Sequence, residues 1–380
     1  MFDITRITRP SILAQHEYTP NKPPDAVMRD LGFNDYVDLA TNENPHGISP
    51  RAYAAILKEA KDRLHHYPES TCHDVLQKLA EVHCLSPENF IVDNGLDAVI
   101  SLLGMTFLDP LDEIIIPDPT FHAYENTAAR MGAAVVRTAL TVDYRPDIDK
   151  IIAAVTDKTK VIFICNPNNP TGTIITEIEF KRLLGAVPPG VLLVVDEAFY
   201  EFVDDPAYPQ TIPYLQEYAN LVVLRSFSKT MALAGLRIGY AVASPEIIRM
   251  LLRAREPFPV NRLAQVAAAA ALEDHEFIQR TLEINRISRK KMAAAFEELG
   301  VKAVPSQTNF VFIDLGRPVA PVWEAMFKQG VIVRKLENSG APTCMRICLG
   351  KQRDLQRALN ALASALGKKA PLAFTEYIDE

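Results

Sequence analysis

One short segment of the chain brings together an amine, two hydroxyl groups and a guanidinium. Lys229 follows Ser226 and Ser228 in the stretch Ser-Phe-Ser-Lys-Thr, and Arg237 comes eight residues later. Such an amine can form an imine with an aldehyde, while the hydroxyls and the guanidinium can hold a phosphate. The segment therefore indicates a site for an aldehyde cofactor that carries a phosphate. A single lysine is more often simply solvated, so this interpretation depends on other motifs.

A carboxylate, Asp196, follows an apolar run at residues 191–195. Burying a carboxylate without a partner is costly, so this position suits a cationic heterocycle nitrogen, a metal or a helix N-terminus. The pair Asp196-Glu197 also fits the acidic motif of nucleoside triphosphatases. The chain has no G-x-x-x-x-G-K-S/T loop, which argues against that class.

Two further motifs add polar groups at the ends of predicted strands or within them. Residues 166–172 contain two X-Pro steps and a glycine, which make a rigid turn at the carboxyl end of a strand. Ligands of open α/β sheets bind at that edge, although an ordinary turn is the alternative. Arg346 lies inside an apolar strand, and its planar fork suits a carboxylate or a phosphate. A structural salt bridge is the alternative for Arg346.

Segments typical of strands alternate with segments typical of helices, which favours α/β layering. Several strand segments are continuous apolar runs, as expected for strands covered on both faces. We expect strands at residues 90–92, 113–116, 160–164, 191–195 and 221–224. We expect helices at residues 98–107, 123–131 and 177–184, and a further helix that starts at Ser244-Pro245.

The 380 residues, 48% of them hydrophobic, suit a globular protein of two domains. The predicted division is an N-terminal arm with part of a small domain at 1–45, a large cofactor-binding domain at 46–270, and a small C-terminal domain at 271–380. The first 40 residues are rich in proline, so we expect an extended arm there. Residues 260–298 are mostly helical in pattern and precede the strands expected in the small domain at residues 309–314, 330–336 and 345–349.

The composition argues against several classes of partner. A net charge of −7 disfavours nucleic acids and anionic membranes. No apolar run approaches the roughly 20 residues of a membrane span, and the start lacks a signal-peptide pattern, so we expect a cytoplasmic protein. The five cysteines include no C-x-x-C pair, which argues against a disulfide framework and a structural zinc. No metal site is predicted, and Cys344 and Cys348 are interpreted as packing residues.

Taken together, the motifs N-P-T-G, D-E-A, S-x-S-K and the later arginine occur in the order and spacing of one enzyme family. The chain resembles the fold-type I pyridoxal-phosphate enzymes of the class I/II aminotransferase superfamily over nearly its whole length. Residues 18–23, 40–47 and 67–69 resemble the histidinol-phosphate aminotransferase branch. The resemblance implies a three-layer large domain with a mostly parallel central sheet, as in aspartate aminotransferase, and a smaller α+β domain. It also implies pyridoxal 5'-phosphate as the cofactor.

The resemblance assigns cofactor roles to residues of this chain. Lys229 would hold the cofactor as an imine and move the proton between the substrate α-carbon and the cofactor. Asp196 would pair with the pyridinium nitrogen, Asn169 would bond the phenolic oxygen, and Phe121 would stack on the ring. The residues expected around the phosphate are Gly95, Leu96, Asp97, Ser226, Ser228 and Arg237.

The resemblance also implies a homodimer and a reaction. Tyr67 would reach the phosphate from a neighbouring subunit. Asn44 and Arg346 would grip a substrate carboxylate, while Tyr18 and Arg334 would face the far end of the substrate. The amino group would pass from histidinol phosphate or a related amino compound to a 2-oxo acid, 2-oxoglutarate, by a ping-pong mechanism.

Two departures from the family pattern leave an alternative open. Phe199 stands where most members have a tyrosine that donates to the phenolic oxygen, and losing that donor should raise the pKa of the lysine–cofactor imine. Leu96 stands where a small or hydroxyl residue is common. A lyase, decarboxylase or amino-acid cyclase of the same fold, acting without a 2-oxo acid, is the alternative. The S-x-x-K pattern that ends at Lys229 lacks the S-D-N and K-T-G partners of β-lactamases.

Overall fold

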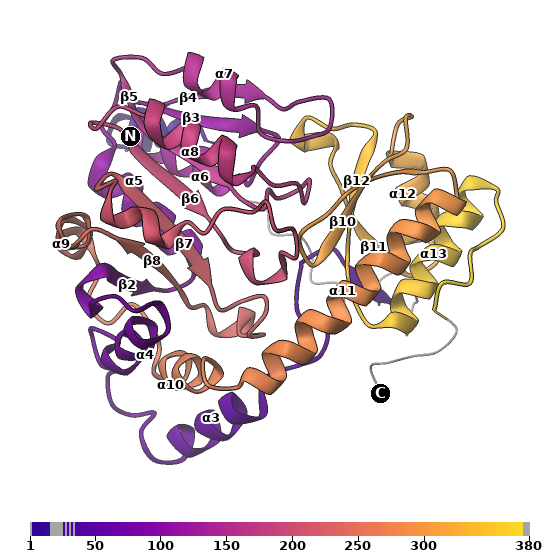
Figure 1. The fold of residues 1–380 in the computed structure, drawn as a ribbon, viewed down its shortest axis with the longest axis horizontal. Helices are drawn as coiled ribbons and strands as arrows, with labels where there is room; N and C mark the ends of the chain where they lie inside the picture. The colour runs from indigo at the N-terminus through magenta and orange to yellow at the C-terminus, as the bar shows by residue number, and fades with distance from the viewer. Residues whose placement is uncertain (1, 16–25, 27–28, 30–31, 33–34, 375–380) are drawn as a thin grey trace.

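The structure of the protein is a computed structural model that describes residues 2–15, 26, 29, 32 and 35–374, so the predicted Tyr18 lies outside it. The described residues form a seven-stranded sheet and a five-stranded sheet, each with its own hydrophobic core (Figure 1). The predicted α/β class is confirmed by this arrangement of sheets and covering helices.

The larger sheet is mostly parallel, with the strand order β2-β8-β7-β6-β5-β3-β4. Only β8 runs antiparallel among its described strands, and it lies between β2 and β7. The strands are β2 (Phe90–Asp93), β3 (Glu113–Asp118), β4 (Ala134–Ala139), β5 (Thr159–Cys165), β6 (Leu192–Asp196), β7 (Leu221–Ser226) and β8 (Gly239–Ala243). All five strands predicted for this part of the chain are therefore present, and β4 and β8 were not predicted.

Helices cover both faces of the larger sheet, which gives three layers (Figure 1). One face packs against α5 (Leu96–Phe107), α6 (Ala123–Met131) and α9 (Pro245–Ala254). The other face packs against α4 (His73–His83), α7 (Ile148–Ala153), α8 (Glu177–Ala186) and α10 (Arg262–Ala271), and α3 (Pro50–Asp62) lies on α10. Neighbouring strand residues such as Ile162 and Phe163 enter opposite cores, which explains the continuous apolar runs in the sequence.

The smaller sheet takes strands from both ends of the chain, in the order β1-β11-β12-β10-β9. They are β1 (Val37–Leu39), β9 (Lys302–Val304), β10 (Phe310–Asp314), β11 (Val331–Lys335) and β12 (Cys344–Cys348). The helices α12 (Ala320–Phe327) and α13 (Gln352–Leu366) pack against its core. The long helix α11 (His275–Glu298) extends from the larger part of the molecule to the smaller one (Figure 1). The predicted boundaries at residues 45 and 270 stay a prediction.

The start of the chain differs from the expected extended arm. It contains a 3-10 turn, η1 (Ile4–Arg6), and a short helix, α1 (Pro10–Leu13). Pro10 suits the first position of a helix because its missing N–H would have no partner there. The helix α1 lies on α6, where the Ser11 hydroxyl donates to the Arg130 carbonyl at 3.2 Å.

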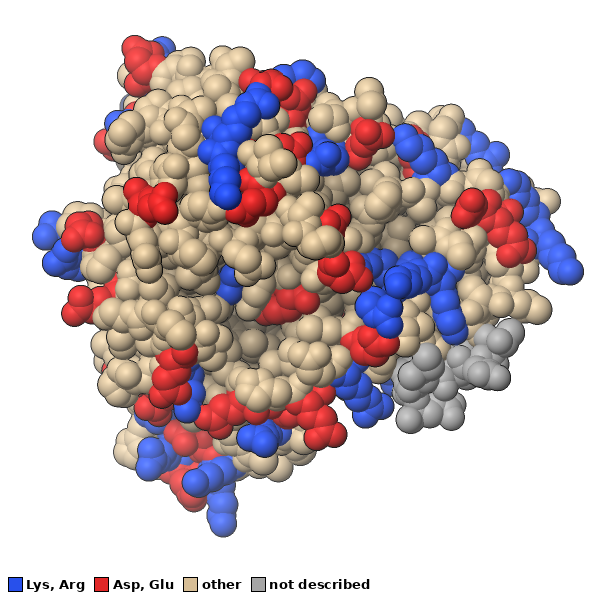
Figure 2. Space-filling model, in the orientation of Figure 1, with Lys and Arg blue, Asp and Glu red and all other residues tan. Residues whose placement is uncertain are grey.

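Acidic and basic side chains are mixed over the face of the molecule shown in Figure 2. Between residues 2 and 374, leaving aside the positions without a description, no helix has both the length and the apolar character that a membrane crossing needs.

Candidate active site

A cavity of about 490 Å³ lies where β5, β6 and β7 end and where β11 and β12 of the smaller sheet face them. Most residues predicted for the site line it, and Gly95 lies directly before the first of them. These residues are Leu96, Asp97, Phe121, Asn169, Asp196, Ser226, Ser228, Lys229, Arg237, Arg334 and Arg346. Residues far apart in the sequence thus meet at the carboxyl edge of the larger sheet, as open α/β sheets predict.

Lys229 follows β7, and its amine is buried in the cavity wall with the Phe199 ring 5.8 Å away. Burial lowers the pKa of Lys229 to about 8, and the cations Arg346 and Arg237 act in the same direction. About a tenth of the amine is therefore neutral at pH 7, far more than for an ordinary lysine. A neutral amine can act as a nucleophile toward a carbonyl and as a base toward a proton.

Asp196 ends β6 and is 2% exposed. The Tyr124 hydroxyl donates to its Oδ2 at 2.7 Å, and the Ala198 amide donates to its Oδ1 at 3.0 Å. Burial raises the pKa of Asp196 to about 6, and these two hydrogen bonds oppose that shift. Asp196 has no cationic partner in the described part of the chain. The carboxylate therefore suits a cation that comes from a bound group. Tyr124 was not predicted.

The phosphate end of the site is a backbone cradle at the start of α5. Gly95 has φ +81°, and a Cβ there would lie 2.6 Å from Nη2 of Arg237. A Cβ on Gly239 would lie 2.9 Å from the backbone nitrogen of Leu96. Glycine is thus required at both positions for the helix N-terminus, the guanidinium and the strand to approach so closely. This set of backbone N–H groups and a cation fits a phosphate.

Side chains complete the phosphate end. Ser226 and Ser228 line it from the end of β7, and the Ser228 amide donates to the Ser226 hydroxyl at 3.0 Å. Arg237 lies 3.4 Å from the Asp97 carboxylate. The side chain of Leu96, the first residue of α5, packs into the hydrophobic core, so only its backbone can bind a phosphate. This agrees with the expectation for a leucine where the family commonly has a small or hydroxyl residue. The donors of this end therefore fit the phosphate of pyridoxal phosphate.

In the middle of the cavity, the aromatic ring of Phe121 lines one wall and the side-chain amide of Asn169 lines another. The Phe121 ring lines it and meets the Tyr124 ring edge-on, with the centroids 5.7 Å apart. Nη1 of Arg346 donates to Oδ1 of Asn169 at 2.6 Å, which leaves the Asn169 amide nitrogen as its available donor. Phe199 also lines the cavity, whereas the adjacent Tyr200 places its ring under the Arg225 guanidinium at 3.5 Å. Tyr200 therefore does not replace the missing tyrosine donor.

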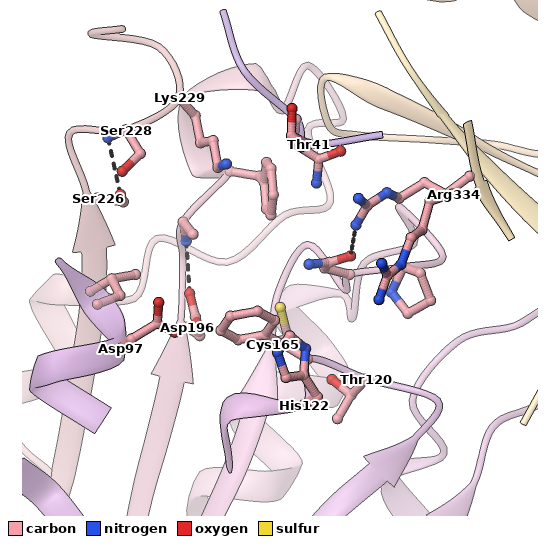
Figure 3. A pocket seen from close by; sticks show the side chains of 18 of the residues that line it. Thr41, Asp97, Thr120, His122, Cys165, Asp196, Ser226, Ser228, Lys229 and Arg334 are labelled. Atoms are coloured by element: carbon pink, nitrogen blue, oxygen red, sulfur yellow. Dashed lines mark hydrogen bonds between the residues drawn. The ribbon is translucent and has the colours of Figure 1, made fainter. Parts of the chain in front are cut away.

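Two arginines form the far end of the cavity. Arg334 on β11 and Arg346 on β12 are directly opposite in an antiparallel pair, so both side chains project from one face of the smaller sheet. Arg346 donates to the Ala40 carbonyl at 2.6 Å, while Arg334 makes no ion pair with a residue that the structure describes. Figure 3 shows Arg334 across the cavity from Lys229, Ser226 and Ser228. Paired guanidiniums suit a dianion such as a phosphate or a dicarboxylate.

Some predicted residues are placed elsewhere. Asn44 donates its amide to the Thr230 carbonyl at 3.2 Å and lies outside the cavity, whereas Asn42 lines it. Tyr67 is 79% exposed and stacks on Phe258, with the ring centroids 4.9 Å apart. The lining residues that were not predicted include Thr41, Thr120, His122 and Cys165, which Figure 3 labels.

The comparison with known families agrees with this geometry. The model of the family "Aminotransferase class I and II" matches residues 34–362. The chain belongs to this family. It is therefore an enzyme of the aminotransferase class, and the predicted family and enzyme class are confirmed.

The individual relatives of this chain carry a more specific name than the family. The chain is 43% identical to a histidinol-phosphate aminotransferase of Moorella thermoacetica, over 94% of this chain and 92% of that protein. It is 40% identical to the histidinol-phosphate aminotransferase of Bacillus subtilis (strain 168), over 92% of this chain and 97% of that protein. Both relatives carry the name of an aminotransferase, and neither carries the name of a lyase, decarboxylase or cyclase.

Solved structures share the fold. The crystal structure of histidinol-phosphate aminotransferase from Sinorhizobium meliloti, in complex with pyridoxal-5'-phosphate, superposes with a TM-score of 0.88 at 25% identity and covers 95% of this chain and 97% of that chain. The aspartate aminotransferase of Thermus thermophilus with maleate gives a TM-score of 0.83 at 22% identity, over 94% of this chain and 99% of that chain, which shows the fold alone. The predicted aspartate-aminotransferase-like fold is thus confirmed.

Proposed function

We propose that this aminotransferase moves the amino group of histidinol phosphate to 2-oxoglutarate by a ping-pong mechanism, with pyridoxal 5'-phosphate as cofactor. The observation that carries the proposal is the single cavity with a phosphate cradle at one end, Lys229 and Asp196 in the middle and two arginines at the other end. The names of the relatives agree with this donor, and 2-oxoglutarate is the acceptor expected from the sequence.

When bound, pyridoxal phosphate supplies an aldehyde carbon that bonds to amines and a ring that withdraws electrons from the substrate α-carbon. Lys229 would hold that carbon through Nζ and would carry a proton to and from the substrate, and its lowered pKa of about 8 suits an amine that must lose its proton. The buried carboxylate of Asp196 would pair with the ring nitrogen and keep it protonated. The Asn169 amide would donate to the phenolic oxygen, and Phe121 would cover the ring.

The two arginines accept both substrates in turn. Histidinol phosphate brings a phosphate and 2-oxoglutarate brings two carboxylates, so each presents an anion to the same pair of guanidiniums. Arg346 is fixed by its bonds to Ala40 and Asn169, whereas Arg334 has no described anionic partner to release. Of the two carboxylates of 2-oxoglutarate, we assign the one nearer the 2-oxo group to Arg346 and the distal one to Arg334. The predicted contact of Tyr18 with the distal end stays a prediction, and Asn44 supports the segment through Thr230.

We infer a homodimer in which Tyr67 of one subunit reaches the phosphate cradle of the other. Tyr67 lies outside its own cavity, although the resemblance assigns it to a phosphate. Phe258, against which Tyr67 stacks, and apolar side chains of α3 and of the segment before Tyr67 are also exposed, as expected for a surface that a second copy covers. They are Tyr53, Leu57, Leu64 and Phe258. The cytoplasmic location and the domain division at residues 45 and 270 remain parts of this proposal.

The first test is a half-reaction followed by visible absorption. Purified holoenzyme is titrated with histidinol phosphate and no 2-oxo acid. We expect the band of the Lys229-bound cofactor to disappear in proportion to the donor added, and 2-oxoglutarate to restore it. A band that does not respond to histidinol phosphate would overturn the proposed donor. Product formed at a catalytic rate without any 2-oxo acid would instead favour the lyase, decarboxylase or cyclase alternative.

A further inference from the structure

Asn42 holds an uncommon backbone conformation in the wall of the cavity. Its φ is +55°, in the left-handed region, which asparagine adopts more readily than most residues other than glycine. The residue is nevertheless only 3% exposed and lies on a segment that lines the site. Such a conformation persists when the surroundings fix it, and residues that hold it cluster at active sites and ligand-binding positions.

Three hydrogen bonds from the smaller sheet fix Asn42. The Asn42 amide donates to Sγ of Cys348 at 3.0 Å, and the Cys348 thiol donates to Oδ1 of Asn42 at 2.8 Å. The side-chain amide of Asn309 donates to the Asn42 carbonyl at 3.1 Å. Burial raises the pKa of the Cys348 thiol, so the thiol keeps the proton that it donates. Cys348 is therefore more than a packing residue.

These bonds decide which way the Asn42 side chain is turned. Because Oδ1 accepts from the thiol, Nδ2 is the polar atom left to face the cavity. Nδ2 has no hydrogen-bond partner among the residues that the structure describes. Two residues earlier, the Ala40 carbonyl accepts from Arg346. The free amide and the guanidinium thus border the same end of the cavity.

We propose that Asn42 donates its side-chain amide to the carboxylate of the 2-oxo acid that Arg346 binds, and that Cys348 is the positioning residue that turns the amide toward it. The inference rests on the proposed function and adds a residue to its acceptor site. A neutral donor beside a guanidinium contributes direction to carboxylate binding without adding a charge. The left-handed backbone then serves to present this donor.

The test measures binding of succinate, an unreactive dicarboxylate, to holoenzyme by titration calorimetry. Asn42→Gly removes the amide and tolerates the positive φ, and we expect about tenfold weaker binding because a hydrogen bond to a charged ligand is lost. Asn42→Asp puts an acceptor and a negative charge in the same place, so we expect a loss of about 100-fold. Cofactor affinity, read from the visible band, should stay as in the unaltered enzyme.

Three cysteine variants test the positioning role. Cys348→Ala removes the donor to Oδ1 and should weaken succinate binding about fivefold, whereas Cys348→Ser keeps a donor and should restore most of the affinity. Cys344→Ala is the matched control, because Cys344 is buried on the same strand and bonds to Tyr144 and Thr343 instead. It should bind succinate like the unaltered enzyme.

Unchanged succinate binding by Asn42→Gly would overturn the inference, and so would equal affinities of the serine and alanine variants at Cys348. A holoenzyme that binds no succinate at all would also overturn it. Because succinate binding requires no amino donor, a failure of histidinol phosphate to react would count against the proposed function and would leave this measurement interpretable.

Discussion

Asp196 and Glu197 are consecutive carboxylates at the end of one strand, yet their surroundings are opposite. Asp196 faces the cavity and receives only neutral donors from the described residues, the Tyr124 hydroxyl and the Ala198 amide. Glu197 faces away from the cavity, and Arg225 donates to its Oε2 twice, at 2.9 and 2.8 Å. The hydroxyls of Tyr208 and Thr211 donate to its Oε1. One carboxylate is thus left without a charge partner, and the other is fully compensated.

The two neighbouring residues therefore have different roles: Glu197 stabilises the fold, and Asp196 serves the site. A buried ion pair with every lone pair occupied fixes the structure, because removing one partner leaves an uncompensated charge. A buried carboxylate without a cation raises the free energy of the empty protein and favours any ligand that supplies the missing charge. The pyridinium nitrogen of the cofactor is such a ligand.

The largest effect is expected on the cavity side, from Lys229→Ala. The variant loses the only amine that we place at the reacting carbon, so we expect transamination to fall by about 10⁴-fold or more. The fold should be retained, because a buried amine stabilises nothing that we identify. Steady-state rates and thermal unfolding measure both. Lys181→Ala, at an exposed lysine, is the control and should keep full activity. A Lys229→Ala enzyme with near-normal turnover would contradict the site.

The scaffold side is tested by Glu197→Gln. The change leaves the buried Arg225 without its anion, and we expect a loss of about 3–5 kcal/mol in the free energy of unfolding. Turnover per folded molecule should change little, since Glu197 does not line the cavity. Urea unfolding with activity assays on the folded fraction measures both. The double variant Glu197→Leu/Arg225→Met should recover part of the stability, because it removes both charges but leaves the Thr211 hydroxyl without its acceptor. A double variant no more stable than Glu197→Gln would contradict the role of the paired charge.

Asp196→Asn should raise the free energy of unfolding of the cofactor-free protein, whereas Glu197→Gln should lower it. The folded pKa of Asp196, about 6, lies above the model-peptide value of 3.8. The contribution of Asp196 to the free energy of unfolding is therefore fully present below pH 3.8, and it is lost as the pH rises through about 6. We expect the variant to gain up to about 3 kcal/mol over the unaltered protein at pH 8, with no gain near pH 3.8. Denaturant titrations across this pH range measure the gain, and a constant difference at all pH values would refute it.

The same variant should lose function while it gains stability. Without a carboxylate at the ring nitrogen, both cofactor affinity and turnover should fall. A variant that is stabilised and fully active would break the contrast between Asp196 and Glu197.

The smallest expected effect concerns Phe199→Tyr, which restores the donor found in most of the family. An added hydrogen bond to the phenolic oxygen stabilises its ionised form, so the pKa of the Lys229-bound cofactor should fall by about one unit or less. A visible pH titration measures the shift. Tyr200→Phe is the matched control, because the Tyr200 ring lies against Arg225 and should leave the titration unchanged. A rise in the pKa of the Phe199→Tyr enzyme would contradict the placement of residue 199 beside the cofactor.

Much of the fold could be predicted because the central strands of a covered sheet are apolar without interruption. The strands at residues 160–164 and 221–224 were found for this reason, and the structure extends them only at their ends. The edge strand β4 has only a short apolar start, Ala134 to Val136, before Arg137 and Thr138, and one of its six residues is buried, so it lacks the long apolar run of the central strands. The strand β8 begins at Gly239 and consists of small and apolar residues that also suit a helix, and its place between β2 and β7 depends on contacts that no local pattern records.

The site residues could be predicted where a sequence motif fixes the backbone. They were harder to predict where two nearby residues of the same type could each line the cavity. The cofactor residues follow strand ends and glycine turns, and they converge as expected. Asn42 and Asn44 are two residues apart in one motif, and the sequence did not show that Asn42 lines the cavity while Asn44 bonds to the Thr230 carbonyl. Tyr124 was missed because its partner, Asp196, is 72 residues away.

The helix α11 has a consequence for how the molecule comes apart. It is about 36 Å long for its 24 residues, without a break. Arg289 joins it to the Phe202 carbonyl and Asp204 on the side of the larger sheet, while Met292 and Phe296 are buried in the core of the smaller sheet. One continuous helix is thus held to the larger part of the molecule by Arg289 and buried in the core of the smaller sheet, so unwinding it from either end removes support from the other part. The two sheets should therefore melt as one cooperative unit rather than in sequence.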